Sequence, residues 1–313
     1  MRKILLPFPV LAFLLAFAAA PSWASERLVL MLDWFPNVDH VPVYAALQSG
    51  MFEKRGIQLE IQSPSESSDP LKLAAAGHAD VALSYQPQVI MAASTGIPLK
   101  ALGRLVGHPL TTLLFIRGKG ISLPRDLEGR KIGYTVPGMM DILLRAFASL
   151  NGVRSYVPVN VGFSIVQALA AGQVDAVMGP FKNYEPVAME MEGLAPGFFE
   201  IEQHGIPAYD ELVFVAGAEV FKKKEGLLRC FLDAVAEGMA FTGENPEKAL
   251  ELYFQAVPEA PREMETRAFR RTLPFFGPDI SLDPGRWKAF GQFAREFGMT
   301  SSEVNMDELL AKW

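Results

Sequence analysis

Residues 32–40 read LDWFPNVDH, and the chain continues through VPVYAA (41–46) to GMFEKRGI (50–57). This pattern predicts a strand that ends near Leu32, a loop that carries Trp34 and several polar side chains, and then a helix. In an open α/β sheet the ligand crevice lies beyond the carboxyl ends of the strands. A Trp at the end of the first strand would therefore stand in that crevice, and the alternative is a Trp packed into a core.

The first 25 residues have the composition of a secretory signal peptide. Arg2 and Lys3 precede an apolar run over residues 4–20, and Ser22 and Ala24 are small residues at the positions that a signal peptidase reads. The sequence therefore predicts cleavage near residue 25, with a retained membrane anchor as the alternative. No later segment approaches the roughly 20 apolar residues that span a bilayer, so we expect a soluble mature chain.

The charge balance excludes several classes of partner. Without Arg2 and Lys3, 27 basic residues stand against 35 acidic ones, which gives the mature chain a net charge of −8. Such a charge repels nucleic-acid phosphates and anionic lipids. Cys230 lies in an apolar-periodic run and is expected to be a buried hydrophobe. The four histidines lack the spacing of metal ligands, so we predict no metal site and no cofactor.

Short β-rich runs alternate with helical ones after the signal region. The predicted elements are strand 27–32, helix 41–55, strand 57–62, helix 69–76, strand 81–85 and helix 87–95. A second set comprises strand 131–136, helix 140–150, strand 157–161, helix 164–171, strand 176–178 and a helix from about residue 184. Such alternation favours mostly parallel sheets with helices on their faces.

Segments 73–82 and 169–177 resemble each other, and both read as a helix, a Gly stop, an Asp turn and a buried strand. They indicate two lobes of like topology, although two ordinary helix-to-strand turns can also look alike. The β-like runs 111–116 and 211–216 are the predicted crossings between the lobes. The predicted helices 219–242, 246–255, 262–273, 286–297 and 306–313 would then return to pack on the first lobe.

The predicted fold is an α/β protein with two lobes, each a mostly parallel sheet flanked by helices. The predicted division is a signal peptide at 1–25, a first lobe of 26–111 plus 217–313, and a second lobe of 112–216 that includes the crossing strands. Two lobes of ordinary size fit a mature chain of this length.

With these features the chain resembles the periplasmic solute-binding proteins of ABC importers, of the type II kind with two crossings. Segments 32–37, 69–73, 84–88 and 183–185 carry a narrower resemblance to the branch that includes thiamine-pyrimidine synthases. In that branch the importer proteins are similar to formylaminopyrimidine-binding proteins. The resemblance implies capture of a thiamine pyrimidine precursor and its delivery to a membrane permease with its ATPase. It also implies a monomer in the periplasm, and no cysteine ends the signal region to carry a lipid.

The same branch contains a pyrimidine synthase, which would need a Schiff-base lysine and a donor histidine just after the third strand. These positions correspond to Ser84 and Gln88, and the cysteine-rich run of the enzyme corresponds to residues 209–214, which contain no cysteine. A serine cannot form the imine, so we predict a binding protein without catalytic residues. Three alternatives stay open: a binding protein for another planar heterocycle such as riboflavin, one for an alkylsulfonate, and an extracytoplasmic sensor domain.

The chemistry of a flat heteroaromatic ligand selects the candidate site residues. Aromatic faces hold such a ring by stacking, and Trp34 and Tyr85 are the predicted clamp. A carboxyl group can meet the donor and acceptor edge of an aminopyrimidine with paired hydrogen bonds, and Glu185 is the first candidate, unless it is only a helix-start carboxylate. The other predicted ligand-binding residues are polar groups that could equally cap the backbone: Asn37, His40, Gln88, Tyr184, Tyr209 and Glu211.

The loop at residues 134–141 bears on the charge of the ligand. Oxyanions are commonly bound where Ser or Thr with Gly opens a helix, because free N–H groups and the helix dipole meet there. This loop reads YTVPGMMD, and Asp141 would repel an anion. The sequence thus disfavours nitrate, sulfonate and phosphate-ester ligands.

Overall fold

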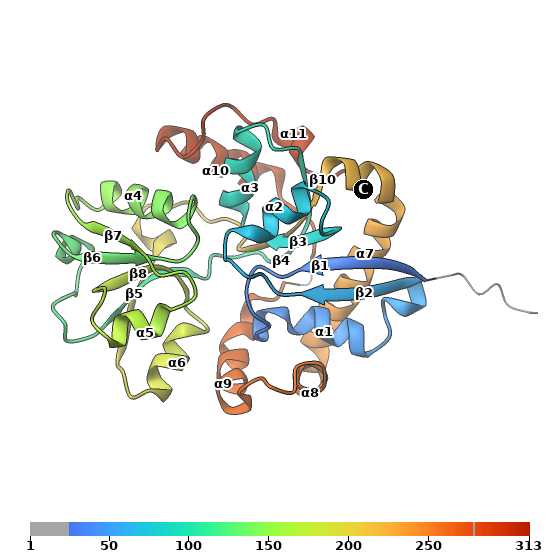
Figure 1. Cartoon of the computed structure of the whole chain (residues 1–313), viewed down its shortest axis with the longest axis horizontal. Helices are drawn as coiled ribbons and strands as arrows, with labels where there is room; N and C mark the ends of the chain where they lie inside the picture. Colours follow the sequence, from blue (N-terminus) through green and yellow to red (C-terminus); the bar gives the residue numbers. More distant parts are fainter. Residues whose placement is uncertain (1–24, 278) are drawn as a thin grey trace, which may run out of the picture.

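The computed structural model describes residues 25–277 and 279–313, which form two lobes (Figure 1). Each lobe is built on a five-stranded sheet, and the two strand orders are equivalent: β2-β1-β3-β10-β4 in the first and β7-β6-β8-β5-β9 in the second. The two-lobed α/β architecture is therefore as predicted. The predicted signal peptide lies outside the described residues, apart from Ser25.

The first sheet contains β1 (Glu26–Met31), β2 (Ile57–Gln62), β3 (Val81–Ser84), β4 (Leu99–Val106) and β10 (Leu212–Gly217). β1 pairs in parallel with β2 and β3, whereas β10 runs antiparallel to both β3 and β4. All residues of β3 and β10 are buried, as expected of strands covered by helices on both faces.

The second sheet repeats this arrangement with β5 (Thr111–Ile116), β6 (Lys131–Tyr134), β7 (Val157–Asn160), β8 (Ala176–Phe181) and β9 (Pro196–Glu200). β6 pairs in parallel with β7 and β8, and β5 runs antiparallel to β8 and β9. Each sheet is therefore mostly parallel with one reversed strand.

The chain passes between the sheets twice, at residues 107–110 after β4 and at residues 201–211 after β9. The second passage includes the short helix η4 (Ile201–His204). Residues 212–216, which the predicted division groups with the second lobe, pair instead in the first sheet, because β10 is an apolar strand that lies between β3 and β4. The other boundaries of that division stay a prediction.

Helices cover both sheets. Around the first sheet lie α1 (Val41–Gln48), α2 (Asp69–Ala75), α3 (Gln86–Ser94), α7 (Ala218–Glu244), α8 (Pro246–Ala256), α9 (Arg262–Thr272), α10 (Pro284–Glu296) and α11 (Met306–Leu309). Around the second lie α4 (Met140–Leu150), α5 (Ile165–Ala170) and α6 (Glu185–Met191). Further short helices are η1 (Val38–His40), η2 (Glu53–Arg55), η3 (Pro124–Leu127) and η5 (Leu273–Phe275).

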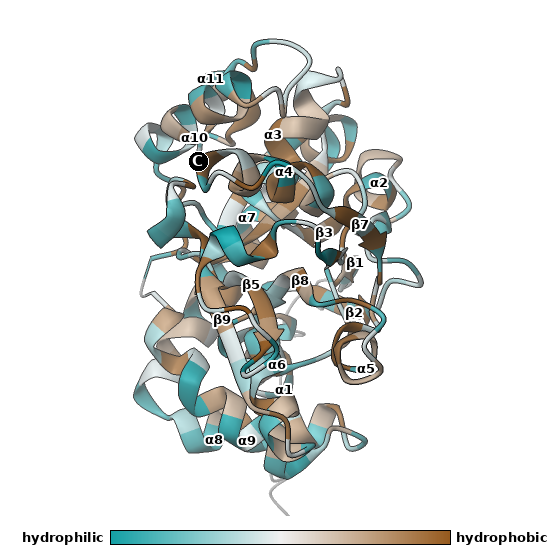
Figure 2. Cartoon of the chain, turned by 90° about the vertical axis from the view of Figure 1, so that its left-hand side faces the viewer, coloured by the Kyte–Doolittle hydropathy of each residue, from teal (hydrophilic) through white to brown (hydrophobic). Residues whose placement is uncertain are grey.

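The C-terminal helices return to the first lobe, as the sequence predicted. α7 packs on α1 and β4, α8 packs on α1, and α10 packs on α3. Gly238 of α7 permits the contact with α1, because a side chain there would collide with the backbone oxygen of Pro42. Viewed from the second lobe, β5 and β8 are brown and apolar, whereas the outer helices α8 and α9 carry much teal (Figure 2). The core thus lies between the sheets and their helices.

Some predicted elements differ from the observed ones. The helix expected at 41–55 ends at Gln48, because Gly50 takes a left-handed φ of +69° and the chain continues as η2. The helix expected at 306–313 ends at Leu309, since Leu310 forms a β-bridge with Ala101 and the following residues run along β4. The strands β4 and β9 were not predicted.

Candidate functional site

A cavity lies between the two lobes. Its first-lobe lining follows the carboxyl ends of β1 and β3. Its second-lobe lining comes from the carboxyl end of β8, the residues just after β6 and β8, and the start of α5, so the cavity lies where an α/β sheet places ligands. The lining residues are Asp33, Trp34, Asn37, Asp39 and Tyr85 from the first lobe, and Thr135, Ile165, Gly179, Phe181, Tyr184 and Glu185 from the second. Five of the nine predicted ligand-binding residues are therefore brought together here: Trp34, Asn37, Tyr85, Tyr184 and Glu185.

A buried hydrogen-bond network fixes the first-lobe wall. The Tyr85 hydroxyl donates to Asp33 Oδ2 at 2.9 Å, and His40 Nε2 lies 2.9 Å from Asp33 Oδ1. Because the Asn37 backbone N–H donates to His40 Nδ1 at 3.2 Å, Nε2 is the ring nitrogen that carries the proton toward Asp33. Burial and Asp33 keep the pKa of Tyr85 well above its usual value, so its hydroxyl remains a donor. Both oxygens of Asp33 are thus occupied, and His40 stands behind the cavity wall as a support.

Asn37 lines the cavity, and its side chain also hydrogen-bonds the backbone of the loop after β1. Its side-chain oxygen accepts from the Asp39 N–H at 2.9 Å at the start of η1, and its amide donates to the Phe35 carbonyl at 3.0 Å. This N-cap ends the extended chain after β1 and turns it into η1 and α1. The side chain therefore holds the loop that presents Trp34.

Asp39 is a carboxyl group at the cavity with one oxygen that accepts no hydrogen bond from the described residues. It is 1% exposed; its Oδ1 accepts from Asn183 Nδ2 of the second lobe at 2.7 Å, and its Oδ2 has no hydrogen-bond partner among the described residues. Burial raises the pKa of Asp39 to about 7, against the lowering influence of His40 and Asn183. An unpartnered buried oxygen is costly, so Asp39 Oδ2 is a ready partner for a donor on a ligand.

Glu185 faces Asp39 from the second lobe at the start of α6. Its Oε2 accepts from the Phe181 N–H at 2.6 Å, and its Pro neighbour occupies the first turn of the helix. Burial raises the pKa of Glu185 to about 7, although the hydrogen bond from Phe181 lowers it. Near neutral pH this carboxyl can therefore be either an acceptor or a donor.

Aromatic rings meet across the cavity. Trp34 packs against the apolar cluster of the second lobe, and its ring contacts that of Phe163 edge-on, with centroids 4.4 Å apart. Tyr85 and Phe181 face each other edge-on at 6.4 Å. Aromatic faces from both lobes thus border the space where a planar ring could be held.

The cavity is narrow in this conformation, with about 20 Å³ of free space, room for roughly one water molecule. Gly179 forms part of its wall at φ +120°, where any side chain would collide with Thr135. A ligand larger than water therefore enters only when the lobes part or the aromatic side chains move.

Besides His40, three predicted residues do not line the cavity. Gln88 accepts from the Ser84 hydroxyl at 2.7 Å and lines a separate groove of about 430 Å³ beside α2 and α3. Tyr209 and Glu211 are fully buried at the passage between the lobes. Glu211 accepts hydrogen bonds from the Leu110 and Thr111 N–H groups at 2.5 and 2.7 Å and from the Thr111 hydroxyl at 2.9 Å, so it ties the two passages together.

Sequence reasoning did not select several lining residues. Asp33 and Asp39 stand in the quoted segment 32–40 and could have been found as carboxyl groups beside the predicted Trp34. Phe181 could have been found by extending the predicted strand 176–178 to its observed end. Thr135, Ile165 and Gly179 carry no distinctive signal, because only the approach of the two lobes makes them neighbours.

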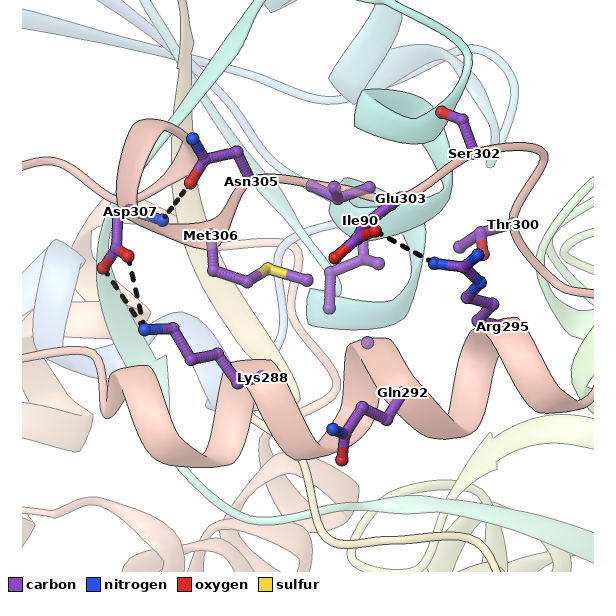
Figure 3. A pocket seen from close by; sticks show the side chains of 12 residues that line it. Ile90, Lys288, Gln292, Arg295, Thr300, Ser302, Glu303, Asn305, Met306 and Asp307 are labelled. Carbon is purple, nitrogen blue, oxygen red and sulfur yellow. Dashed lines mark hydrogen bonds and ion pairs between the residues drawn. The ribbon is translucent and has the colours of Figure 1, made fainter.

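A larger groove of about 560 Å³, lined by first-lobe residues, lies between α10 and residues 300–307 (Figure 3). Two ion pairs span it, Lys288 with Asp307 at 3.3 Å and Arg295 with Glu303 at 3.1 Å, and the side chain of Met306 lies between them. Each of these charges already has its counter-charge, and the side chains are largely exposed. The chemistry of the groove therefore selects no ligand, unlike that of the interlobe cavity.

Residues 25–277 and 279–313 contain no cluster of three or more His, Cys, Asp or Glu side chains placed to hold a metal ion. Within the same ranges, no helix combines the length and apolar character needed to cross a membrane.

Comparison with known proteins identifies relatives over most of the chain. A protein named for thiamine biosynthesis from Haemophilus influenzae is 35% identical over 295 residues, covering 92% of each chain. The formylaminopyrimidine-binding protein of Halalkalibacterium halodurans is 32% identical and covers 82% of this chain and 79% of its own. A 4-amino-5-hydroxymethyl-2-methylpyrimidine phosphate synthase from Legionella pneumophila is 27% identical, with 92% of each chain covered.

The fold is confirmed by solved structures. The alkanesulfonate-binding protein of Xanthomonas axonopodis, bound to MOPS, superposes with a TM-score of 0.73 at 15% identity, covering 92% of this chain and 98% of that one. The two lobes thus have the periplasmic-binding-protein fold that the resemblance implied. The model of the family described as "NMT1/THI5 like" matches residues 37–249, and together with the relatives above this shows that the chain belongs to the NMT1/THI5-like family.

Proposed function

We propose that this protein is the binding component of an ABC importer and captures an aminopyrimidine related to the pyrimidine of thiamine. The observation that carries the proposal is the pair of carboxyl groups, Asp39 and Glu185, which face one interlobe cavity among aromatic side chains.

The donor and acceptor pattern of the cavity suits an aminopyrimidine. The ligand offers an exocyclic amine, which donates, beside a ring nitrogen, which accepts. Glu185 in its protonated form can donate to the ring nitrogen and accept from the amine, and burial that raises its pKa to about 7 makes this form accessible near neutral pH. Asp39 Oδ2 can accept a second proton of the amine, since it has no partner among the described residues. The two carboxyl groups come from different lobes, so such a ligand would favour closure.

The cavity is unsuited to anions. Among the described lining residues there is no Lys or Arg, whereas there are three carboxyl groups. At the start of α4, where an oxyanion could bind, Asp141 accepts from the Gly138 N–H at 2.7 Å and thereby occupies the loop. These features argue against an alkylsulfonate, even though the fold is shared with a sulfonate-binding protein.

Ligand size argues for a single ring. The free space of about 20 Å³ has to grow before any heterocycle fits, and a pyrimidine requires a smaller opening than the three fused rings of a flavin. The related protein from Halalkalibacterium halodurans is named for binding formylaminopyrimidine, which supports the same ligand class.

The enzymatic alternative lacks its key groups. Ser84 stands where the synthase would carry its Schiff-base lysine, and its hydroxyl donates to Gln88 at 2.7 Å, away from the cavity. Without an amine at this position no imine can form with pyridoxal phosphate. Incubation with pyridoxal phosphate should therefore produce no imine absorbance, and its appearance would favour the synthase.

The decisive experiment is a calorimetric and thermal-shift titration of residues 26–313 with formylaminopyrimidine, hydroxymethylpyrimidine, thiamine, riboflavin and taurine. A pyrimidine should stabilise the fold selectively, and the shift should grow with ligand concentration as mass action requires. Tighter binding of riboflavin or taurine would retain an importer role but refute the proposed ligand. The periplasmic location is tested separately, by fractionation of cells that express the full chain.

A further inference from the structure

The second lobe also contacts the C-terminal helix α9, which belongs to the first lobe. In Figure 1 α9 lies beside α6, across the boundary between the lobes, and α9 packs on α8 and η1 on its other side. Residues of α9 bond to Tyr184 and Glu190, which lie 81 positions earlier in the sequence. The two lobes are therefore also held together at a place other than the cavity.

Three polar contacts join α9 to residues 183–190, which include most of α6. The Tyr184 hydroxyl donates to Glu265 Oε1 at 2.8 Å, and Asn183 Nδ2 lies 2.7 Å from the Thr272 hydroxyl oxygen. At the exposed end, Arg271 pairs with Glu190 at 2.8 Å. Glu265 is 1% exposed, so its bond to Tyr184 is sheltered from water.

An apolar contact accompanies these bonds. Val187 of α6 is fully buried in a cluster whose other buried members come from η1, α1, α8, α9 and the residues that follow α8. This side chain of the second lobe is thus packed into a core of the first. Parting the lobes would expose it, together with the Tyr184–Glu265 bond.

The same short segment serves the cavity. Tyr184 and Glu185 line the cavity on one side, while the Tyr184 hydroxyl reaches Glu265 on the other. Glu265 is not a lining residue, so it reaches a ligand only through Tyr184. A ligand that binds Tyr184 and Glu185 and the contacts of α9 with Tyr184 therefore stabilise the same conformation, the one in which the two lobes touch.

We infer that α9 and the segment 183–190 form a closure latch, in which Glu265 is a positioning residue that holds Tyr184 and favours the closed protein without touching the ligand. The inference rests on the proposed function for its ligand, but the latch itself concerns only the two lobes. Because a ligand drives closure only by contacts that differ between open and closed forms, weakening the latch raises the free energy of the bound state and lowers affinity.

The central pair is tested by a double-mutant cycle. Tyr184→Phe removes the donor and keeps the ring, and Glu265→Leu removes the acceptor at similar volume. Each should weaken pyrimidine binding three- to tenfold and speed ligand dissociation, because a buried partner is left unpaired. The double variant should lose less than the product of the single losses, and Glu265→Gln, which keeps an acceptor, should stay near wild type.

The exposed pair has a matched control on the same helix. Arg271 bonds across the lobes to Glu190, whereas Arg262 bonds within the first lobe to Glu251 at 3.2 Å. Glu190→Ala should speed dissociation about twofold and Glu251→Ala should leave it unchanged, since exposed ion pairs contribute little. Equal effects of the two changes would contradict a latch at this end.

Closure is measured directly by distances between spin labels on Cys introduced at Lys119 and Lys223, one exposed site on each lobe, in a Cys230→Ala background. Tyr184→Phe and Glu265→Leu should shift the distances toward the open form, with and without ligand. Distances that match wild type in both conditions would overturn the latch. If wild type binds none of the tested ligands, the proposed function fails, and the ligand-free distances still decide the latch.

Discussion

Two pairs of carboxyl groups lie at the boundary between the lobes. Asp210 and Glu211 are buried at the second passage between the sheets, residues 201–211, which we call the hinge; Asp39, buried, and Glu185, half-buried, line the cavity. At the hinge, Asp210 accepts from Arg286 at 2.8 Å and from the Trp287 indole at 2.9 Å, and Glu211 accepts three hydrogen bonds from residues 110 and 111. At the cavity, Asp39 keeps Oδ2 without a partner among the described residues, and Glu185 uses Oε2 for Phe181.

The difference separates structural carboxyl groups from those that can serve a ligand. A carboxylate whose oxygens are all bonded within the protein gains nothing from a new donor, and removing it leaves its partners unpaired. A carboxyl group that lines the cavity and has an oxygen without a partner can accept a hydrogen bond from a ligand. The bonding therefore makes Asp210 and Glu211 structural groups of the hinge, and it supports the proposed ligand role of Asp39 and Glu185.

The largest effect is expected at Asp210. Asp210→Ala should lower the free energy of unfolding by about 3 to 5 kcal/mol, because Arg286 loses its buried counter-charge, Arg104 keeps only the longer pair with Asp279, and Trp287 loses its acceptor. Urea denaturation measures this change in the free energy of unfolding. Asp307→Ala breaks only an exposed pair with Lys288 and should cost less than about 1 kcal/mol. A similar loss in both variants would mean that the hinge carboxylate is not structural.

The pH dependence of stability comes next. Burial raises the pKa of Glu211 in the folded protein to about 7, above its ordinary value of 4.5. The folded state thus binds the proton more tightly, so this stability is fully present below pH 4.5 and is lost as pH rises through about 7. The loss is at most about 3 kcal/mol.

Melting temperatures between pH 4.5 and 7.5 test this dependence. They should fall with rising pH, and Glu211→Gln should make the slope shallower without abolishing it, because the pKa values of Asp39, Glu185 and Glu265 are raised in the same direction. A wild-type stability that rises across this window would contradict the assignment.

Loss of a cavity residue should change binding more than folding. Trp34→Ala and Glu185→Ala should each weaken ligand binding at least tenfold, because one removes an aromatic face and the other a paired hydrogen-bond partner. Calorimetry measures the affinity and circular dichroism checks the fold. Trp313→Ala is a matched control, since that Trp packs on Phe221 away from the cavity. If both cavity variants bound the ligand with wild-type affinity, the proposed ligand site would be refuted.

The smallest effect is expected at Gln88. Its half-buried side chain is bonded to Ser84 and lies outside the cavity, so Gln88→Ala should change the affinity for the ligand less than about twofold, because it removes no part of the cavity lining. The same titration measures it. If Gln88→Ala lowered the affinity as much as Trp34→Ala does, Gln88 would belong to the ligand site of an opened conformation.

Much of the fold could be predicted because its signals are local. The helix at 140–150 and the strand at 57–62 agree with the structure to the residue, since hydrophobic period and flanking turn residues mark both ends. The strands β4 and β9 were missed because Lys100, Gly103 and Arg104 interrupt one and Pro196 and Gly197 open the other. The last residues were expected to be helical, but they dock on β4, where the Trp313 indole donates to the Leu102 carbonyl.

Local sequence signals established most of the order of strands and helices, the family resemblance and the loop that carries Trp34, because periodicity, turn residues and short motifs are read from neighbouring positions. The tertiary structure decided which polar side chains are free. Asp39 bonds to Asn183, 144 positions away, and Glu211 bonds to Thr111, 100 positions away. Whether a buried carboxyl group is satisfied depends on such distant partners, so only the packed lobes distinguish a hinge residue from a ligand-binding one.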